Sequence, residues 1–102
     1  MVFEIIYKSA QQGELLLVEG GFCRWHIRRD GQLTIYEIIS TKPGAGSKIL
    51  EILKKKPVNS IFAKCPVHLK SNEWYPRQGF ELEATVTTKS GDKLNHWRLI
   101  LS

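Results

Sequence analysis

The sequence lacks the features of a membrane-spanning or secreted protein. No run of apolar residues approaches the length of a bilayer-spanning helix, and the first residues, Met1–Glu4, lack the charged and apolar regions of a secretory signal. Cysteine is also scarce, because Cys23 and Cys65 stand far apart and form no CxxC motif. This spacing favours two reduced thiols over a disulfide or a metal site, so we expect a cytoplasmic protein without a bound metal.

Internal repeats, low-complexity segments and linkers are absent as well. A chain of 102 residues fits one domain, so we expect residues 1–102 to form a single unit. Its composition, 42% hydrophobic and 25% charged, is that of an ordinary globular protein. The net charge of +5 suits a polyanionic partner, such as nucleic acid, an acidic membrane surface or a phosphorylated cofactor. Charge alone does not distinguish these partners.

Apolar runs separated by turn residues predict a mixed α/β fold. The expected strands are Val2–Tyr7, Leu15–Glu19, Cys23–Arg29, Gln32–Ile39, Ser60–Lys64, Glu81–Thr88 and Lys93–Leu101. The expected helices are Ser47–Lys56 and a short one that Ser71 or Asn72 caps and Gly79 ends. The sheet should be largely antiparallel, with one parallel strand-helix-strand step and a right-handed crossover.

The clearest hairpin signal is Asp30-Gly31, a dipeptide suited to a type I′ turn. A two-residue turn there would pair Arg29 with Gln32, Ile27 with Thr34, Trp25 with Tyr36 and Arg24 with Glu37. By alternation, one face would carry Cys23, Trp25, Ile27, Tyr36 and Ile38. The other face would carry Arg24, His26, Arg28, Leu33, Ile35 and Glu37.

A glycine-rich loop, Ser40–Ser47, joins the strand that ends at Ile39 to an amphipathic helix. The apolar residues of that helix fall within one arc: Ile49, Leu50, Ile52 and Leu53. A loop in this setting presents consecutive backbone N–H groups at a helix N-terminus, which favours anion binding. Its glycines, Gly44 and Gly46, also fit a tight strand-to-helix turn with no ligand.

A second informative segment is Asn72–Phe80, which follows the strand-like run Ser60–Lys64. Together with the glycine-rich loop, it resembles the acyl-CoA-binding core of the GNAT superfamily of N-acyltransferases. The resemblance covers Phe22–Leu101. Gly44-Ala45-Gly46 matches the glycines of the family's Arg/Gln-x-x-Gly-x-Gly/Ala loop. The later segment matches through the set Asn72, Tyr75, Gly79 and Phe80.

The resemblance implies transfer of an acetyl group from acetyl-CoA to an amine acceptor, without a metal. The backbone N–H groups of Gly44, Ala45, Gly46 and Ser47 would hold the pyrophosphate. Thr41 stands at the family's basic or amide position, and the adjacent Lys42 could supply the charge. Backbone groups of Ile38, Ile39 and Ser40 are the expected pantetheine partners. Asn72 fits two roles, a cofactor contact or a helix N-cap.

Tyr75 is the candidate general acid that protonates the departing CoA thiolate, since a phenol is protonated at neutral pH. Its alternative role is packing beside Trp74. Glu37 is the candidate general base, acting directly or through water. The predicted register offers a plainer role for Glu37, a cross-strand ion pair with Arg24.

Family members usually carry one or two helices between their first two strands, where this chain has only Lys8–Glu14. The acceptor site would then be open, completed by another chain or absent, so a homodimer is one expectation. A catalytically inactive module that binds acyl-CoA or a partner protein is the main alternative function. Single-strand nucleic-acid binding is less favoured. It would use the interleaved charges and aromatics Arg24, Trp25, His26, Arg28 and Arg29, but alternation points Trp25 away from Arg24 and Arg28.

Overall fold

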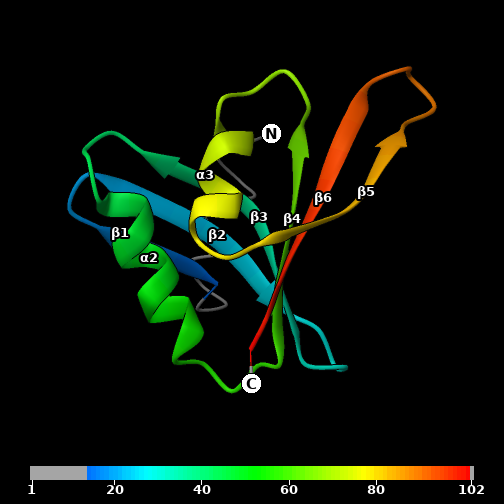
Figure 1. Ribbon diagram of the computed structural model, residues 1–102. Helices are drawn as coiled ribbons and strands as arrows, with labels where there is room; N and C mark the ends of the chain where they lie inside the picture. The colour runs from blue at the N-terminus through cyan, green and yellow to red at the C-terminus, as the bar shows by residue number, and fades with distance from the viewer. Residues whose placement is uncertain (1–13, 102) are drawn as a thin grey trace.

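The computed structural model describes residues 14–101, which form one six-stranded sheet and two helices (Figure 1). The strands are β1 (Leu15–Val18), β2 (Gly21–Ile27), β3 (Gln32–Ser40), β4 (Ser60–Pro66), β5 (Glu81–Thr87) and β6 (Lys93–Ile100). The helices are α2 (Ala45–Lys54) and α3 (Ser71–Arg77). The predicted strand Val2–Tyr7 and all of Lys8–Glu14 except Glu14 lie outside the described residues.

The sheet runs in the order β1-β2-β3-β4-β6-β5, and every neighbouring pair is antiparallel except β3 and β4. Helix α2 connects these two parallel strands. The predicted mixed α/β sheet with one parallel step is therefore confirmed. No helix in the described part of the chain is long and apolar enough to cross a membrane.

Both helices contribute to one hydrophobic core on the same side of the sheet. Helix α2 buries Ile49, Leu50 and Leu53 completely, as its amphipathic pattern predicts. Helix α3 adds Tyr75 to the same cluster. The sheet supplies Cys23, Trp25, Leu33, Ile35, Ile61, Ala63, Cys65 and Trp97. This core fixes the two helices against the strands that flank the candidate site.

The hairpin between β2 and β3 has a different turn from the one predicted. Gly31 N–H donates to the Arg28 carbonyl, and Arg28 N–H donates to the Gln32 carbonyl. Gly31 has a φ of +91°, so it supplies the left-handed residue of a three-residue loop with a glycine bulge. The predicted two-residue turn is wrong, because Asp30-Gly31 serves both loop types.

The longer loop shifts the inner pairs by one residue. Trp25 pairs with Ile35, not with Tyr36. A β-bulge at Tyr36 then restores the register, so Arg24 does pair with Glu37 as predicted. The predicted faces are wrong for three residues. Leu33 and Ile35 lie on the core face with Trp25, and Tyr36 is half exposed.

The same bulge lies where β3 separates from β4. Parallel pairing between these strands runs from Gln32 opposite Ser60 to Ile35 opposite Ala63 and ends there. Bulges bend a strand and increase its twist. Beyond Tyr36 the two strands diverge, and Figure 1 shows their carboxyl ends well apart. The separation leaves an opening in the sheet between two strands that are joined at their base.

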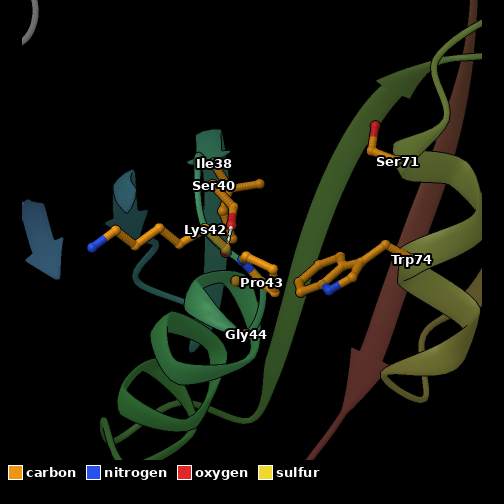
Figure 2. Close-up of a pocket in the computed structure, with 8 residues that line it drawn as sticks. Ile38, Ser40, Lys42, Pro43, Gly44, Ser71 and Trp74 are labelled. Atoms are coloured by element: carbon orange, nitrogen blue, oxygen red, sulfur yellow. Dashed lines mark hydrogen bonds between the residues drawn. The ribbon is translucent and has the colours of Figure 1, made fainter. Parts of the chain in front are cut away.

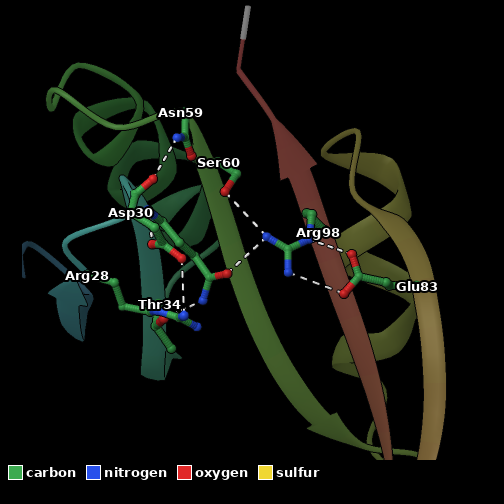
Figure 3. A network of polar contacts seen from close by, with 8 residues as sticks. Arg28, Asp30, Thr34, Asn59, Ser60, Glu83 and Arg98 are labelled. Atoms are coloured by element: carbon green, nitrogen blue, oxygen red, sulfur yellow. Dashed lines mark hydrogen bonds and ion pairs between the residues drawn. The ribbon is translucent and has the colours of Figure 1, made fainter.

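The sheet face opposite the helices carries a polar network centred on Arg98 (Figure 3). Arg98 pairs with Glu83 on β5 through two hydrogen bonds. Its guanidinium also donates to Gln32 Oε1 at 3.0 Å and to Ser60 Oγ at 3.4 Å. The guanidinium carbon lies 4.9 Å from the centre of the Phe62 ring. These contacts tie β3, β4, β6 and β5 together across the sheet.

Candidate functional site

The N-terminus of α2 presents backbone donors beside a cleft. The helix begins at Ala45, two residues before the predicted Ser47. Gly44 is the N-cap residue with a φ of +85°, and no side chain caps the helix. The first i to i−4 bond runs from Lys48 N–H to the Gly44 carbonyl. The N–H groups of Gly46 and Ser47 precede that bond, where helical donors lack intrahelical acceptors.

The cleft has a volume of about 380 Å³ and lies between the glycine-rich loop and α3 (Figure 2). In Figure 2 the Trp74 ring extends from α3 towards Pro43 and Gly44. A Cβ atom on Gly46 would lie 3.3 Å from Trp74 Cζ2, so any larger residue there would require the ring to shift by a few tenths of an ångström. Trp74 is not among the site residues that the sequence predicts, since only tertiary packing places it opposite Gly46.

The residues between β3 and the glycines are held by contacts outside the cleft. Thr41 donates from its N–H and its Oγ1 to the Gly20 carbonyl, at 2.6 and 3.0 Å. Lys42 Nζ pairs with Glu19 at 2.8 Å, and its side chain extends away from Trp74 in Figure 2. Ser40 Oγ donates to the Lys42 carbonyl at 2.8 Å. The backbone of this segment, rather than the Lys42 charge, therefore forms the wall of the cleft.

A second cavity of about 180 Å³ occupies the opening between β3 and β4. Glu37 lines it from β3, Lys64 and Cys65 line it from β4, and Tyr75 lines it from α3. The structure thus brings both predicted catalytic residues to one cavity. Ile38 and Ser71 line this cavity and also the cleft at α2, so the two spaces adjoin.

Tyr75 is deeply buried, with 3% of its surface exposed. Its ring stacks on Trp97 at 5.9 Å between centroids and meets Phe80 edge-on at 5.2 Å. Burial raises the pKa of the Tyr75 hydroxyl well above its usual value, so the group is protonated at neutral pH. Among residues 14–101 the Tyr75 hydroxyl has no hydrogen-bond partner. The packed ring holds the hydroxyl in place, and the hydroxyl is free to donate a hydrogen bond into the cavity.

The predicted ion pair between Arg24 and Glu37 is confirmed. Arg24 Nη2 lies 3.5 Å from Glu37 Oε1, and 37% of the Glu37 side chain is exposed. The Arg24 guanidinium also lies 4.6 Å from the centre of the Tyr36 ring. The pair is long and partly solvated, so Glu37 keeps capacity to accept another hydrogen bond.

Asn72 is not the N-cap of α3, because Lys70 occupies that position without a side-chain cap. Its amide nitrogen donates to the Pro66 and Leu69 carbonyls, both at 2.8 Å. Its amide oxygen accepts from Asn95 Nδ2 and Trp97 Nε1, both at 3.0 Å. Asn72 therefore joins the start of α3 to the end of β4 and to β6. A cofactor contact by Asn72 stays a prediction.

Gly79 ends the segment as predicted, with a φ of +96°. The N–H groups of Gly79 and Phe80 donate to the Pro76 and Tyr75 carbonyls, which is the pattern of a Schellman motif. This turn directs Phe80 back into the core against Tyr75. The Gly-Phe pair thus positions the tyrosine ring.

No protein-family model and no curated protein sequence matches this chain. Solved structures do match. A GNAT-family acetyltransferase from Bacillus cereus is 18% identical with a TM-score of 0.83, over 97% of this chain and 78% of its own. A Bacillus subtilis acetyltransferase solved in complex with CoA is 16% identical with a TM-score of 0.73, over 97% and 84%. The ribosomal-protein-S18-alanine N-acetyltransferase from Escherichia coli is 19% identical with a TM-score of 0.71, over 97% and 77%.

Proposed function

Because the chain has the fold of the GNAT acetyltransferases, we propose that it transfers an acetyl group from acetyl-CoA directly to an amine in a ternary complex. One observation supports this most: the helix N-terminus and the buried Tyr75 hydroxyl face adjoining cavities that share Ile38 and Ser71. One elongated ligand could therefore place its phosphates at the first cavity and its thioester at the second. The solved neighbour that binds CoA has the same fold.

The pyrophosphate would bind at the N-terminus of α2. The N–H groups of Gly46 and Ser47 are available as donors, and the helix dipole favours negative charge there. The side chain of Trp74 would cover the ligand from α3. Backbone groups of Ile38, Ile39 and Ser40 lie beyond the last pair between β3 and β4, so they are candidates for hydrogen bonds to the pantetheine arm.

The chemical step would take place in the opening between β3 and β4. The amine nitrogen attacks the thioester carbonyl, the carbon–sulfur bond breaks, and the thiolate leaves. Glu37 would accept the proton that the amine loses, directly or through water. Tyr75 would donate to the departing sulfur. Its raised pKa makes full proton transfer less favourable than for an ordinary tyrosine, so the hydrogen bond to the sulfur is its first contribution.

The test compares two tyrosines that line the same cavity, Tyr75 and Tyr36. We expect Tyr75→Phe to lower kcat by ~10²-fold or more at similar KM, the usual worth of a hydrogen bond to charge that develops in the transition state. Tyr36→Phe is the matched control and should keep the wild-type rate, since the Tyr36 ring is half exposed. Acetyl-CoA binding is measured separately by calorimetry. If acetyl-CoA binds and no amine in a broad panel is acetylated, the chain is an acyl-CoA-binding module instead.

A further inference from the structure

The cavity between β3 and β4 has a cation in its wall that the acetyl-transfer chemistry does not use. Lys64 lies on β4 opposite His96 of β6, on the sheet face away from the helices. Its side chain is exposed, although the residue lines the cavity. Within residues 14–101 no carboxylate forms an ion pair with Lys64. Its charge is therefore uncompensated by the described residues.

Among residues 14–101, the carboxylate that lines the cavity belongs to Glu37, and its charge is already balanced. Glu37 lines the cavity from the opposite strand and pairs with Arg24. The Glu37 and Arg24 charges offset each other, so the described residues of the cavity wall carry a net positive charge, that of Lys64. A positive charge there attracts anionic groups and repels polycations, because Coulomb interactions at short range favour opposite charges and disfavour like charges.

The carboxylate and the cation of the cavity wall lie on different strands. Glu37 on β3 accepts a proton or a hydrogen bond from an amino group, and Lys64 on β4 donates hydrogen bonds to an anion. The cavity volume of about 180 Å³ admits only a small group between them. A compact molecule with an amino group and a carboxylate a few bonds apart would match both walls.

We propose that the acceptor is a small amine that carries a carboxylate, and that Lys64 binds the carboxylate while the amino group faces Glu37. Lys64 is then a residue that determines acceptor specificity. This inference rests on the proposed function, because it names the acceptor class for the same cavity. It places simple alkylamines and polyamines among the poorer acceptors.

The experiment uses β-alanine and β-alaninamide, which differ in the carboxylate and not in the carbon chain. Rates are compared at equal concentrations of the neutral amine, so that the different amine pKa values do not enter. We expect the wild-type protein to prefer β-alanine in kcat/KM by roughly tenfold or more, the usual worth of a hydrogen bond between charged groups. Lys64→Ala should remove the preference, and Lys64→Glu should reverse it.

Lys89→Ala is the matched control, because Lys89 is exposed in the turn between β5 and β6 and lines neither the cleft nor the cavity. It should keep the wild-type preference. A second readout is calorimetric binding of β-alanine to the protein saturated with CoA, in wild type and Lys64→Ala.

Binding of β-alanine that depends on Lys64, without turnover, would support Lys64 as the binding site of the carboxylate and overturn acetyl transfer to this ligand. Turnover with equal use of both amines would overturn the acceptor class and leave acetyl transfer intact. If the protein shows no preference for β-alanine and binds it without any dependence on Lys64, the inference is overturned.

Discussion

Gly46 offers the sharpest test of the anion site at α2. A Cβ atom added there would lie 3.3, 3.4 and 3.5 Å from Cζ2, Cε2 and Nε1 of Trp74. The shortest of these is tighter than an ordinary contact, so even Gly46→Ala requires the ring to shift. Trp74 is half-buried and can move outward by that amount. A valine at the same position would extend its methyl groups into the cleft itself.

The expected loss of affinity follows from the donors that the valine would block. Two N–H groups, those of Gly46 and Ser47, are available to a phosphate, and a hydrogen bond to a charged group is worth about 1.5–3 kcal/mol. Losing both would cost about 3–6 kcal/mol, which is ~10²–10⁴-fold in the dissociation constant for acetyl-CoA. The fold should survive, because the better helix propensity of alanine or valine offsets part of the cost of displacing the half-buried Trp74 ring.

Gly44→Ala is the matched control, with the opposite pattern of effects. Nothing lies within 4 Å of a Cβ atom at Gly44, but its φ of +85° is left-handed. The substitution should therefore cost about 1–2 kcal/mol in the free energy of unfolding and change acetyl-CoA affinity little. Calorimetry with acetyl-CoA and urea denaturation measure both quantities for each variant. Unchanged affinity in a folded Gly46→Val protein would refute the anion site.

Three further predictions concern stability and reactivity. Asn72→Ala leaves the Trp97 indole N–H unpaired, so the free energy of unfolding should fall by about 2–4 kcal/mol in urea denaturation. The hydrogen bonds from Arg98 lower the pKa of Glu83 below its ordinary 4.5. The pair therefore stabilises the fold above that pH and loses its effect as the pH falls through the lowered pKa, so Glu83→Gln should flatten the acid limb of the stability curve slightly. Burial raises the pKa of the Cys23 thiol to about 12, so mass spectrometry should find Cys23 unmodified by a maleimide in the native protein and modified in urea.

Local patterns in the sequence were enough to predict the described helices and strands and the glycine-rich N-terminus of α2. The amphipathic arc of α2 and the glycines before it are encoded within a few residues of each other, so they predict both a helix and its exposed N-terminus. Tyr75 was singled out by the resemblance, from its position four residues before Gly79-Phe80, and the turn at Gly79 packs Phe80 against its ring. These features depend on residues that are close together in the sequence, so the sequence pattern alone predicts them.

The features that the sequence analysis missed depend on distant partners or on degenerate turn chemistry. Asn72 looked like a helix cap, because its partners Asn95 and Trp97 are contributed by a strand far along the chain. Trp74 belongs to the cleft only because α3 packs against α2 and brings its ring next to Gly46. The hairpin loop was misassigned because Asp30-Gly31 suits two loop lengths, and no local signal marks the bulge at Tyr36.

In terms of chain length, the bulge at Tyr36 is a one-residue insertion. Deleting Tyr36 would shift Glu37 into the register of the inner pairs, so Arg24 would still face Glu37 in an uninterrupted ladder with the same loop. Only the bend would disappear, and with it the cause of the separation between β3 and β4. Deletion of one residue should therefore close the opening between β3 and β4, whereas a substitution at Tyr36 would leave the extra residue of the bulge in place.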